Sequence, residues 1–339
     1  MALGAKTGAS RSLTDVIERE WSLALPNPMP LSTLGPYCQL KAVTVSYPAK
    51  LNGTAASIDT KAASVVAHLP LPMKPSASKR GSSSSSKQLP PPPPIAPSNA
   101  VLASVTLDIE RNSKIGIIGS NGCGKSTLFR LIYEYGETTG DSSENASPVV
   151  IDGSLSKSNN LRIAFYQQHL QDVLPYEMTP LQYLLTYCTQ YQSSLERPLV
   201  DGNAASFNEQ SIRAHLGSFG LGGDLALRQI GVLSGGQKAR VVLAQLTLSR
   251  PHVLLLDEPT NNLDIDGIRA LSVALQNYQG AILIASHDMA FISASCNVVY
   301  TIDTKEKRLK LLEGGCEEYV ENIRKGVEKK RSQANNNNR

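Results

Sequence analysis

The sequence predicts an α/β fold with a mixed, largely parallel β-sheet, and three observations lead to this prediction. The apolar run 114–118 precedes a glycine-rich loop and the helix-forming run 128–134. Strand-like and helix-like stretches then alternate along the chain, which is typical of right-handed crossovers between parallel strands. Polar residues follow apolar strands at 257–258 and 286–288. The C-terminal ends of parallel strands are where α/β sheets bind their ligands.

Length and composition are those of an ordinary globular protein. The chain has 339 residues, of which 41% are hydrophobic and 18% charged, so it can bury a large core. A net charge of +4 does not by itself indicate a nucleic-acid partner. No apolar run in the sequence approaches the roughly 20 residues that span a bilayer. The five cysteines have no metal-ligand spacing, which favours free thiols in a reducing, cytoplasmic compartment.

The first hundred residues contain two segments of irregular composition. We expect residues 1–36 to be a lead-in or linker, because prolines punctuate the segment after one short amphipathic stretch. Residues 39–47 are rich in β-branched side chains and predict a strand that ends at Tyr47. Residues 49–98 contain a serine run and a proline run without periodicity, so we expect a disordered insertion. Alternating polarity over 101–109 predicts the next strand.

The loop at 119–127 follows the pattern G-x-x-x-x-G-K-[ST]. Its glycines leave backbone N–H groups open to phosphate oxygens, and the following helix N-terminus adds positive potential. The lysine of such a loop reaches the β- and γ-phosphates, and the serine supplies a Mg²⁺ ligand. The sequence therefore predicts a nucleotide site, without distinguishing ATP from GTP. The residues expected to hold the nucleotide are Gly119, Ser120, Asn121, Gly122, Cys123, Gly124, Lys125, Ser126 and Thr127.

Strand and helix patterns continue in the second half of the chain. Short strands are expected at 149–151 and 162–166, the second of which leads to Gln168. Helical spacing of apolar residues predicts a helical subdomain over about 170–240, interrupted by a polar loop. Within it, Ser234 has the chemistry of a helix N-cap and is followed by two glycines.

Two further apolar strands end in polar residues that suit nucleotide chemistry. The strand 253–257 ends in Asp257 and Glu258, and the strand 281–285 precedes His287. A helix is expected between them, over 267–278. The last residues, 317–339, have the composition of a basic, asparagine-rich tail.

Taken together, these motifs resemble those of the ATP-binding cassette (ABC) family. In chain order they are an A-loop aromatic (Tyr47), Walker A (119–127), a Q-loop glutamine (Gln168), the signature Leu-Ser-Gly-Gly-Gln (233–237), Walker B (253–257), Glu258, a D-loop ending in Asp264 and the switch His287. The resemblance covers about 37–48 and 100–320. It implies an ABC ATPase domain over 37–316, in which an antiparallel β-subdomain and a helical subdomain accompany the main sheet.

The resemblance also implies a role for each matching residue. Tyr47 stacks on adenine, and Glu258, His287 and Gln168 serve hydrolysis. Mg²⁺ is held by Ser126, Gln168 and Asp257. The residues that bind ATP held by a second cassette are Ser234, Gly235, Gly236, Gln237 and Asp264.

Within the family, the segments 257–264, 238–240 and 286–288 look most like the F subfamily. Its members are cytosolic proteins without transmembrane domains that act on ribosomes, and they usually carry two cassettes. This chain has one, which resembles their second, C-terminal cassette. It departs from the pattern at Asn262, where many members have histidine, and in the long insertion after Tyr47.

Because the signature of a cassette cannot reach its own Walker A loop, the resemblance implies a second cassette as partner. That partner is either another copy of this chain or a different cassette protein. The leading interpretation is an ATPase of the F type that acts on ribosomes. Two alternatives stay open, namely the nucleotide-binding subunit of a membrane transporter and a half-protein that binds ATP with little turnover.

Overall fold

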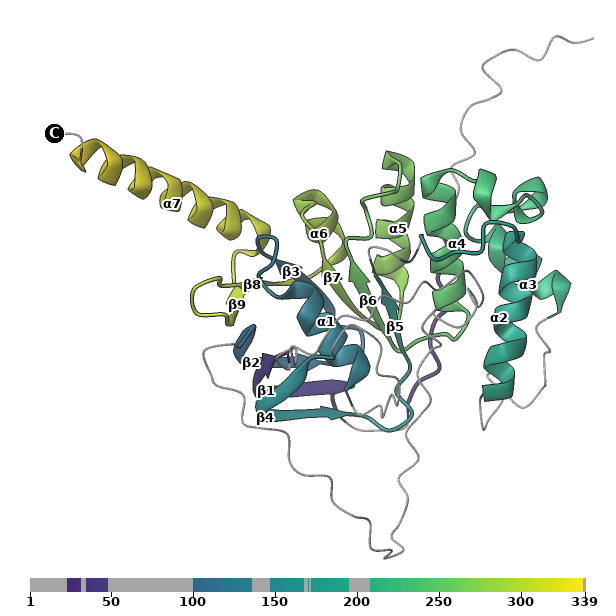
Figure 1. The fold of residues 1–339 in the computed structure, drawn as a ribbon, viewed down its shortest axis with the longest axis horizontal. Helices are drawn as coiled ribbons and strands as arrows, with labels where there is room; N and C mark the ends of the chain where they lie inside the picture. The colour runs from purple at the N-terminus through teal and green to yellow at the C-terminus, as the bar shows by residue number, and fades with distance from the viewer. Residues whose placement is uncertain are drawn as a thin grey trace, which may run out of the picture.

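The computed structural model describes residues 23–31, 35–47, 100–135, 147–167, 170, 172–194 and 208–337. Two β-sheets and several helices form this part of the chain (Figure 1). The predicted lead-in before residue 23, the whole of the predicted insertion at 49–98, and Gln168 lie outside the described residues.

The larger sheet is mixed and largely parallel, as predicted. Its strands are β3 (Lys114–Ile118), β5 (Ile163–Tyr166), β6 (Val253–Asp257), β7 (Ala281–Ala285), β8 (Val298–Ile302) and β9 (Leu309–Leu312). They lie in the order β5-β6-β7-β3-β8-β9, and only the pairing of β9 with β8 is antiparallel. The strands that precede the predicted site residues, β3, β6 and β7, are therefore central and adjacent.

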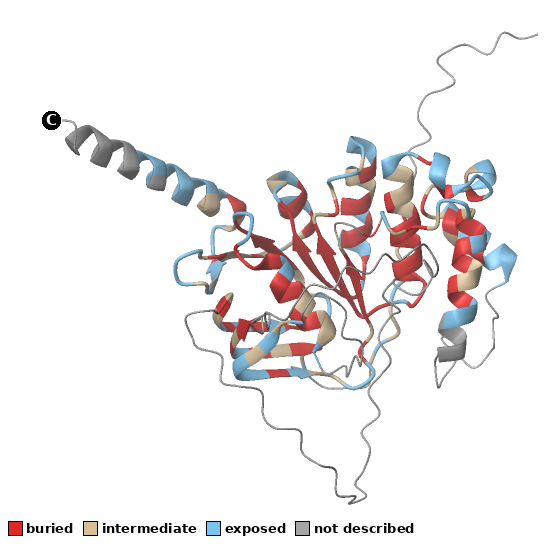
Figure 2. Cartoon of the chain, viewed as in Figure 1, coloured by how far each residue is buried: buried red, intermediate tan, exposed pale blue. Residues whose placement is uncertain are grey.

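Both faces of this sheet are buried, and alternate residues of a strand serve different cores. Leu254 and Leu256 of β6 join one hydrophobic cluster, whereas Val253 and Leu255 join the other. This period-2 division explains why the strand reads as an uninterrupted apolar run. Figure 2 shows buried residues throughout the central strands. The polar residues that follow β6 and β7 are consequently the first ones free to face a ligand.

The smaller sheet is the antiparallel β-subdomain that the resemblance implied. Its strands are β1 (Cys38–Ser46), β2 (Leu102–Ile109) and β4 (Val149–Lys157), in the order β2-β1-β4. It shares one hydrophobic core with α1 (Lys125–Glu134), which follows the phosphate loop. Tyr47 stands directly after β1, so this sheet places it beside the phosphate loop.

Helices cover the opposite face of the large sheet and continue into a helical unit (Figure 1). They are α2 (Pro180–Ser194), α3 (Glu209–Gly217), α4 (Gly235–Thr247), α5 (Ile265–Asn277) and α6 (Met289–Ser295), with the 3₁₀ turns η3 (Gly223–Ala226) and η4 (Ile230–Val232). Leu184, Leu216 and Val242 bring α2, α3 and α4 into one buried cluster. The predicted helical subdomain is thereby confirmed as part of the fold.

The C-terminal segment that was predicted only as a basic tail forms a long helix, α7 (Gly315–Asn337). Cys316 at its start is buried against the core, and the helix then projects away from the body of the molecule (Figure 1). Val320, Ile323 and Val327 are spaced at helical intervals and are exposed. This spacing is the sequence signal for a helix. The prediction followed the lysine- and asparagine-rich composition instead and therefore missed the helix.

Candidate nucleotide-binding site

The phosphate loop connects β3 to α1 and adopts the glycine-dependent conformation that its sequence predicts. Gly122 and Gly124 have φ angles of 76° and 112°, in the left-handed region that favours glycine. A side chain at Gly124 would also meet Leu102, because the ideal Cβ lies 2.9 Å from Leu102 Cδ2. The loop therefore keeps its amides at the start of α1, where the helix dipole favours an anion.

Lys125, Ser126 and Asp257 meet at the floor of the site. The Lys125 ammonium is buried and donates to the carbonyl oxygens of Gly119, at 2.8 Å, and Ser120, at 3.2 Å. Burial raises the pKa of Asp257, while a hydrogen bond with Ser126 and the charge of Lys125 oppose the rise. A hydroxyl and a carboxylate are hard oxygen donors, so this pair fits Mg²⁺, which usually takes few protein ligands besides phosphates and water.

Glu258 and His287 lie above this floor, at the ends of β6 and β7. His287 Nε2 is 2.7 Å from Asn121 Oδ1 and 3.3 Å from Glu258 Oε1. A neutral imidazole with its proton on Nε2 can donate to one of them, and the shorter contact favours Asn121. Glu258 Oε1 is then a buried acceptor without a hydrogen bond in the described part of the chain. A carboxylate oxygen that accepts no hydrogen bond from the protein is suited to accept a proton from water.

The phosphate loop and the acidic end of β6 line one cavity of about 270 Å³. Its walls are formed by Asn121, Gly122, Gly124, Lys125, Ser126, Thr127, Asp257 and Glu258. Tyr47 lies at its edge, because its hydroxyl donates to Thr127 Oγ1 at 3.2 Å. The structure thus brings together three segments that are far apart in the sequence, each placed by a different strand.

The signature segment begins α4 and forms a capping box. Ser234 Oγ accepts from the Gln237 amide at 3.2 Å, and Gln237 Oε1 accepts from the Ser234 amide at 3.0 Å. The predicted N-cap at Ser234 is therefore confirmed, and Gly235 and Gly236 occupy the first helical turn. None of these four residues lines the described cavity around Lys125.

The D-loop lies beside the signature. An ideal Cβ on Gly236 would stand 3.2 Å from the Asn262 carbonyl oxygen, so the glycine permits a close approach of the two loops. Arg240 Nη2 is 3.6 Å from Asp264 Oδ2, and Asp264 also caps α5 by accepting from the Gly267 amide at 2.9 Å. Signature and D-loop therefore form one surface, separate from the cavity.

Sequence patterns did not indicate how the signature helix is held. Lys238 Nζ lies 4.6 Å from the ring centroid of Tyr176, and the Gly231 amide donates to the Tyr176 carbonyl at 2.9 Å. Similarly, Asn121 was predicted only as a phosphate-loop residue, yet it contacts His287. Both contacts join segments that are distant in the chain, so a local sequence pattern could not predict them.

Comparisons with known proteins find similarity to ATP-binding cassette proteins. A family model described as ABC transporter matches residues 102–261. Protein GCN20 of Saccharomyces cerevisiae is 34% identical over 229 residues, which cover 67% of this chain and 26% of that protein. ABC transporter F family member 4 of Arabidopsis thaliana is 36% identical over 231 residues, or 67% of this chain and 28% of that protein. A solved ABC transporter in an inward-facing conformation overlaps 62% of this chain and 76% of its own, with a TM-score of 0.49 and 23% identity.

The chain spans about a quarter of the length of the curated relatives it matches. Among the described residues, no helix is both long and apolar enough to cross a membrane. The matched region includes the phosphate loop, the signature and the acidic end of β6. Residues 102–261 therefore form an ATP-binding cassette domain, and the curated relatives of the chain include members of the F family.

Proposed function

We propose that this chain binds MgATP, hydrolyses it, and does so as one half of a two-cassette ATP sandwich that acts on ribosomes in the cytoplasm. The observation that carries the hydrolysis step is the position of Glu258, whose buried Oε1 has no hydrogen-bond partner in the described residues, in the wall of a cavity that Lys125 and Asp257 also line. The ribosomal role rests on the resemblance to the F subfamily.

Each residue of the cavity has a definite task in this proposal. Lys125 leaves the carbonyls of Gly119 and Ser120 and takes the β- and γ-phosphates, while the loop amides hold the remaining oxygens. Ser126 and Asp257 hold Mg²⁺, which offsets phosphate charge when bound. The family resemblance implies Gln168 as a further Mg²⁺ ligand, and this residue lies outside the described residues. Tyr47, at the cavity edge, supplies an aromatic face for the base.

Glu258 and His287 act on the attacking water and the γ-phosphate. Glu258 Oε1 accepts the proton of the water or orients it, because no described group donates a hydrogen bond to this oxygen when the His287 proton is directed to Asn121. His287, held by Asn121, stands where it can donate to a γ-phosphate oxygen as negative charge develops.

Two exposed apolar side chains support the proposal that a second cassette docks on this chain. Val232 and Ile265 are 72% and 71% exposed, the highest values among the large apolar residues of the described part. Val232 immediately precedes the signature, and Ile265 immediately follows Asp264. Exposed apolar side chains beside open glycine amides suit a surface that docks onto a second cassette and its bound ATP.

Co-sedimentation with ribosomes tests the proposed role. Glu258→Gln removes the proton acceptor but keeps the size of the side chain, so ATP should bind without being cleaved. We expect this variant in the ribosome pellet of a cell extract with ATP, but not with ADP. Lys125→Ala, which loses the phosphate contact, is the control and should stay in the supernatant with either nucleotide.

Other outcomes distinguish the alternatives. Recovery of Glu258→Gln in the membrane pellet would support a transporter subunit. If the variant bound ATP but stayed monomeric and free of ribosomes, the chain would instead be a half-protein with little turnover.

A further inference from the structure

The segment before β1 crosses the whole cassette, although its sequence predicted only a linker. We call residues 23–31 and 35–37 the strap. It contains no helix or strand, and Pro26, Pro28 and Pro30 remove every second backbone donor along its middle. Proline-rich chains of this kind are stiff, because the ring fixes φ. A stiff segment that is attached at both ends can hold two parts of a domain at a fixed separation.

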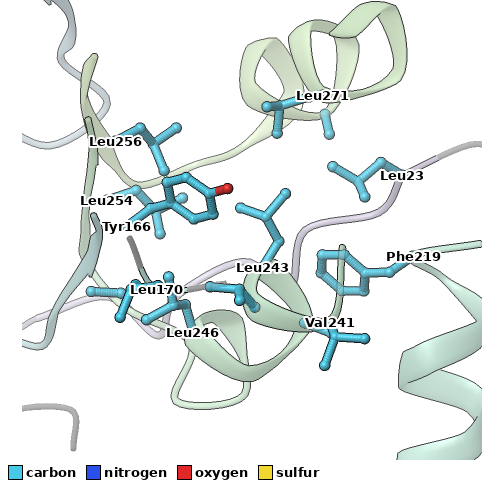
Figure 3. Close-up of a cluster of buried hydrophobic side chains, with 14 of the residues drawn as sticks. Leu23, Tyr166, Leu170, Phe219, Val241, Leu243, Leu246, Leu254, Leu256 and Leu271 are labelled. Carbon is cyan, nitrogen blue, oxygen red and sulfur yellow. The ribbon is translucent and has the colours of Figure 1, made fainter. Parts of the chain in front are cut away.

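The first end of the strap is attached to the helical unit. Leu23 is 7% exposed and lies in the cluster that contains Phe219, Leu243 of α4 and Leu271 of α5 (Figure 3). The Ala24 amide donates to the carbonyl of Ser218, at the end of α3, at 3.2 Å. Leu23 thus packs on the body of the helix whose N-terminus is the signature.

The middle of the strap is attached to the loops at the base of the large sheet. The Gln279 amide, after α5, donates to Asn27 Oδ1 at 3.0 Å. His252 Nε2, before β6, is 2.9 Å from the Met29 carbonyl oxygen. Because His252 Nδ1 accepts from the Arg162 amide at 3.0 Å, the ring is neutral with its proton on Nε2 and donates to Met29.

The last part of the strap is attached to the β-subdomain. Arg111 donates from Nη2 to the Leu31 carbonyl and from Nε to the Tyr37 hydroxyl, both at 3.2 Å. The Tyr37 ring packs edge-on against His252, with a centroid distance of 5.9 Å. One short segment therefore touches the helical unit, the base of the sheet and the sheet that places Tyr47.

We propose that the strap positions the signature helix α4 and the helical unit relative to the sheet that carries the phosphate loop. Its anchors Asn27 and His252 are positioning residues, since neither lines the nucleotide cavity. The effect on turnover rests on the proposed two-cassette function, because only there does the placement of the signature limit hydrolysis. The effect on the helical unit itself does not depend on that function.

Asn27→Ala in the full chain tests the proposal at an exposed position, where folding is least disturbed. We expect an ATPase kcat reduced roughly five-fold, with the Kd for MgATP unchanged, because a coupling of this kind is modest. Hydrogen exchange measured by mass spectrometry without nucleotide should become faster over 216–221 and over the first turns of α4. Asn27→Asp keeps the acceptor for Gln279 and should restore both quantities.

Two further variants separate anchoring from general loosening. His252→Asn places an acceptor near Nδ1 but loses the donor to Met29, whereas His252→Gln places a donor near Nε2. The asparagine variant should reproduce Asn27→Ala, and the glutamine variant should lie closer to wild type. Gln276→Ala is the matched control, since its Nε2 donates to the Ala294 carbonyl, away from the strap, and it should change neither kcat nor exchange at α4.

The proposal is overturned if exchange in Asn27→Ala rises only within the strap, or if kcat and exchange at α4 equal those of wild type. If the wild-type chain hydrolyses no ATP, the proposed function fails. The exchange data then still decide whether the strap positions the helical unit.

Discussion

Glu258 occupies a backbone conformation that few residues other than glycine adopt. Its φ angle is 51°, and its amide donates to the Ala285 carbonyl at the end of the neighbouring strand at 2.8 Å. A backbone conformation of this kind costs roughly 1–3 kcal/mol, and the hydrogen bond to Ala285 helps to hold it in place. Such strained conformations concentrate at functional sites. The turn brings the carboxylate beside His287, so the chemistry at this position depends on the backbone as well as on the side chain.

Buried His252 gives stability a pH dependence. Burial, together with the charges of Arg162 and Arg111, lowers its pKa from 6.5 to about 4. The neutral ring is favoured in the folded state, so its contribution is complete above about pH 6.5 and is lost as pH falls towards 4. From the difference between the two pKa values, the loss approaches roughly 3 kcal/mol of unfolding free energy.

Urea unfolding between pH 7.5 and 4 measures this effect, with His252→Gln as the non-titrating reference. Burial also lowers the pKa of His215, but His215 is present in both proteins and cancels in the comparison. The stability advantage of the wild type should shrink as pH falls. Parallel curves for the two proteins would show that His252 is not the group responsible.

Gly153 is required by its backbone rather than by a ligand. Its φ is 88°, and an ideal Cβ would lie 2.5 Å from the Ala42 carbonyl oxygen on β1. We expect Gly153→Ala to lower the unfolding free energy by about 2 kcal/mol or more, measured by denaturant unfolding. Gly217→Ala is the control, because Gly217 has no neighbour within 4 Å and ends a helix. Equal stability of the two variants would contradict this assignment.

The roles of residues within a local sequence motif could be predicted, whereas the roles of residues that depend on long-range contacts could not. Lys125 stands in a nine-residue motif that specifies loop, helix and ligand together. His252 lacks any such motif, since its partner Met29 lies 223 positions away, and the sequence supplied no reason to assign it a role. Physical interactions of this second kind depend on the fold, so they become visible only in three dimensions.

At the scale of elements, apolar runs and caps predicted the centre of the sheet well. β6 and β7 were expected over the same residues that they occupy, because both faces of each strand are buried. α6, β8 and β9 are short or half-exposed and carry weaker patterns, and we did not predict them. Local patterns predicted strands at 39–47, 101–109 and 149–151, but their antiparallel pairing into one subdomain was implied by the family resemblance alone. β4 is mostly exposed, and the insertion separates it from its partner β1 in the chain.

The capping box of α4 makes a separate prediction for stability. Ser234→Ala removes the acceptor for the Gln237 amide, so the unfolding free energy should fall by about 1 kcal/mol. Ser234→Thr retains a hydroxyl at the N-cap, so its unfolding free energy should fall by less than that of Ser234→Ala. Thermal or denaturant unfolding of the two variants measures the difference. A Ser234→Ala protein as stable as wild type would mean that the capping box contributes nothing to folding.

At the scale of the whole molecule, the site is divided. The cavity with Lys125, Asp257 and Glu258 lies at the ends of the central strands, whereas Ser234 and Asp264 lie on another surface of the same chain. The strap joins the two parts, because it is attached to the helical unit at Leu23 and to the sheet at His252. In the proposed two-cassette sandwich, each chain would supply the cavity of one site and the signature surface of the other, and the separation of these two surfaces supports that proposal.

Complementation between two inactive variants tests this claim most directly. Glu258→Gln keeps an intact signature but cannot activate water, and Ser234→Arg keeps Glu258 but blocks the signature. Neither should hydrolyse ATP alone. In an equimolar mixture, half of the dimers are mixed and each has one intact site of two, so activity should recover to about a quarter of the wild-type rate. Absence of recovery, with both variants folded and binding MgATP like the wild type, would contradict an ATP site shared between two copies of this chain.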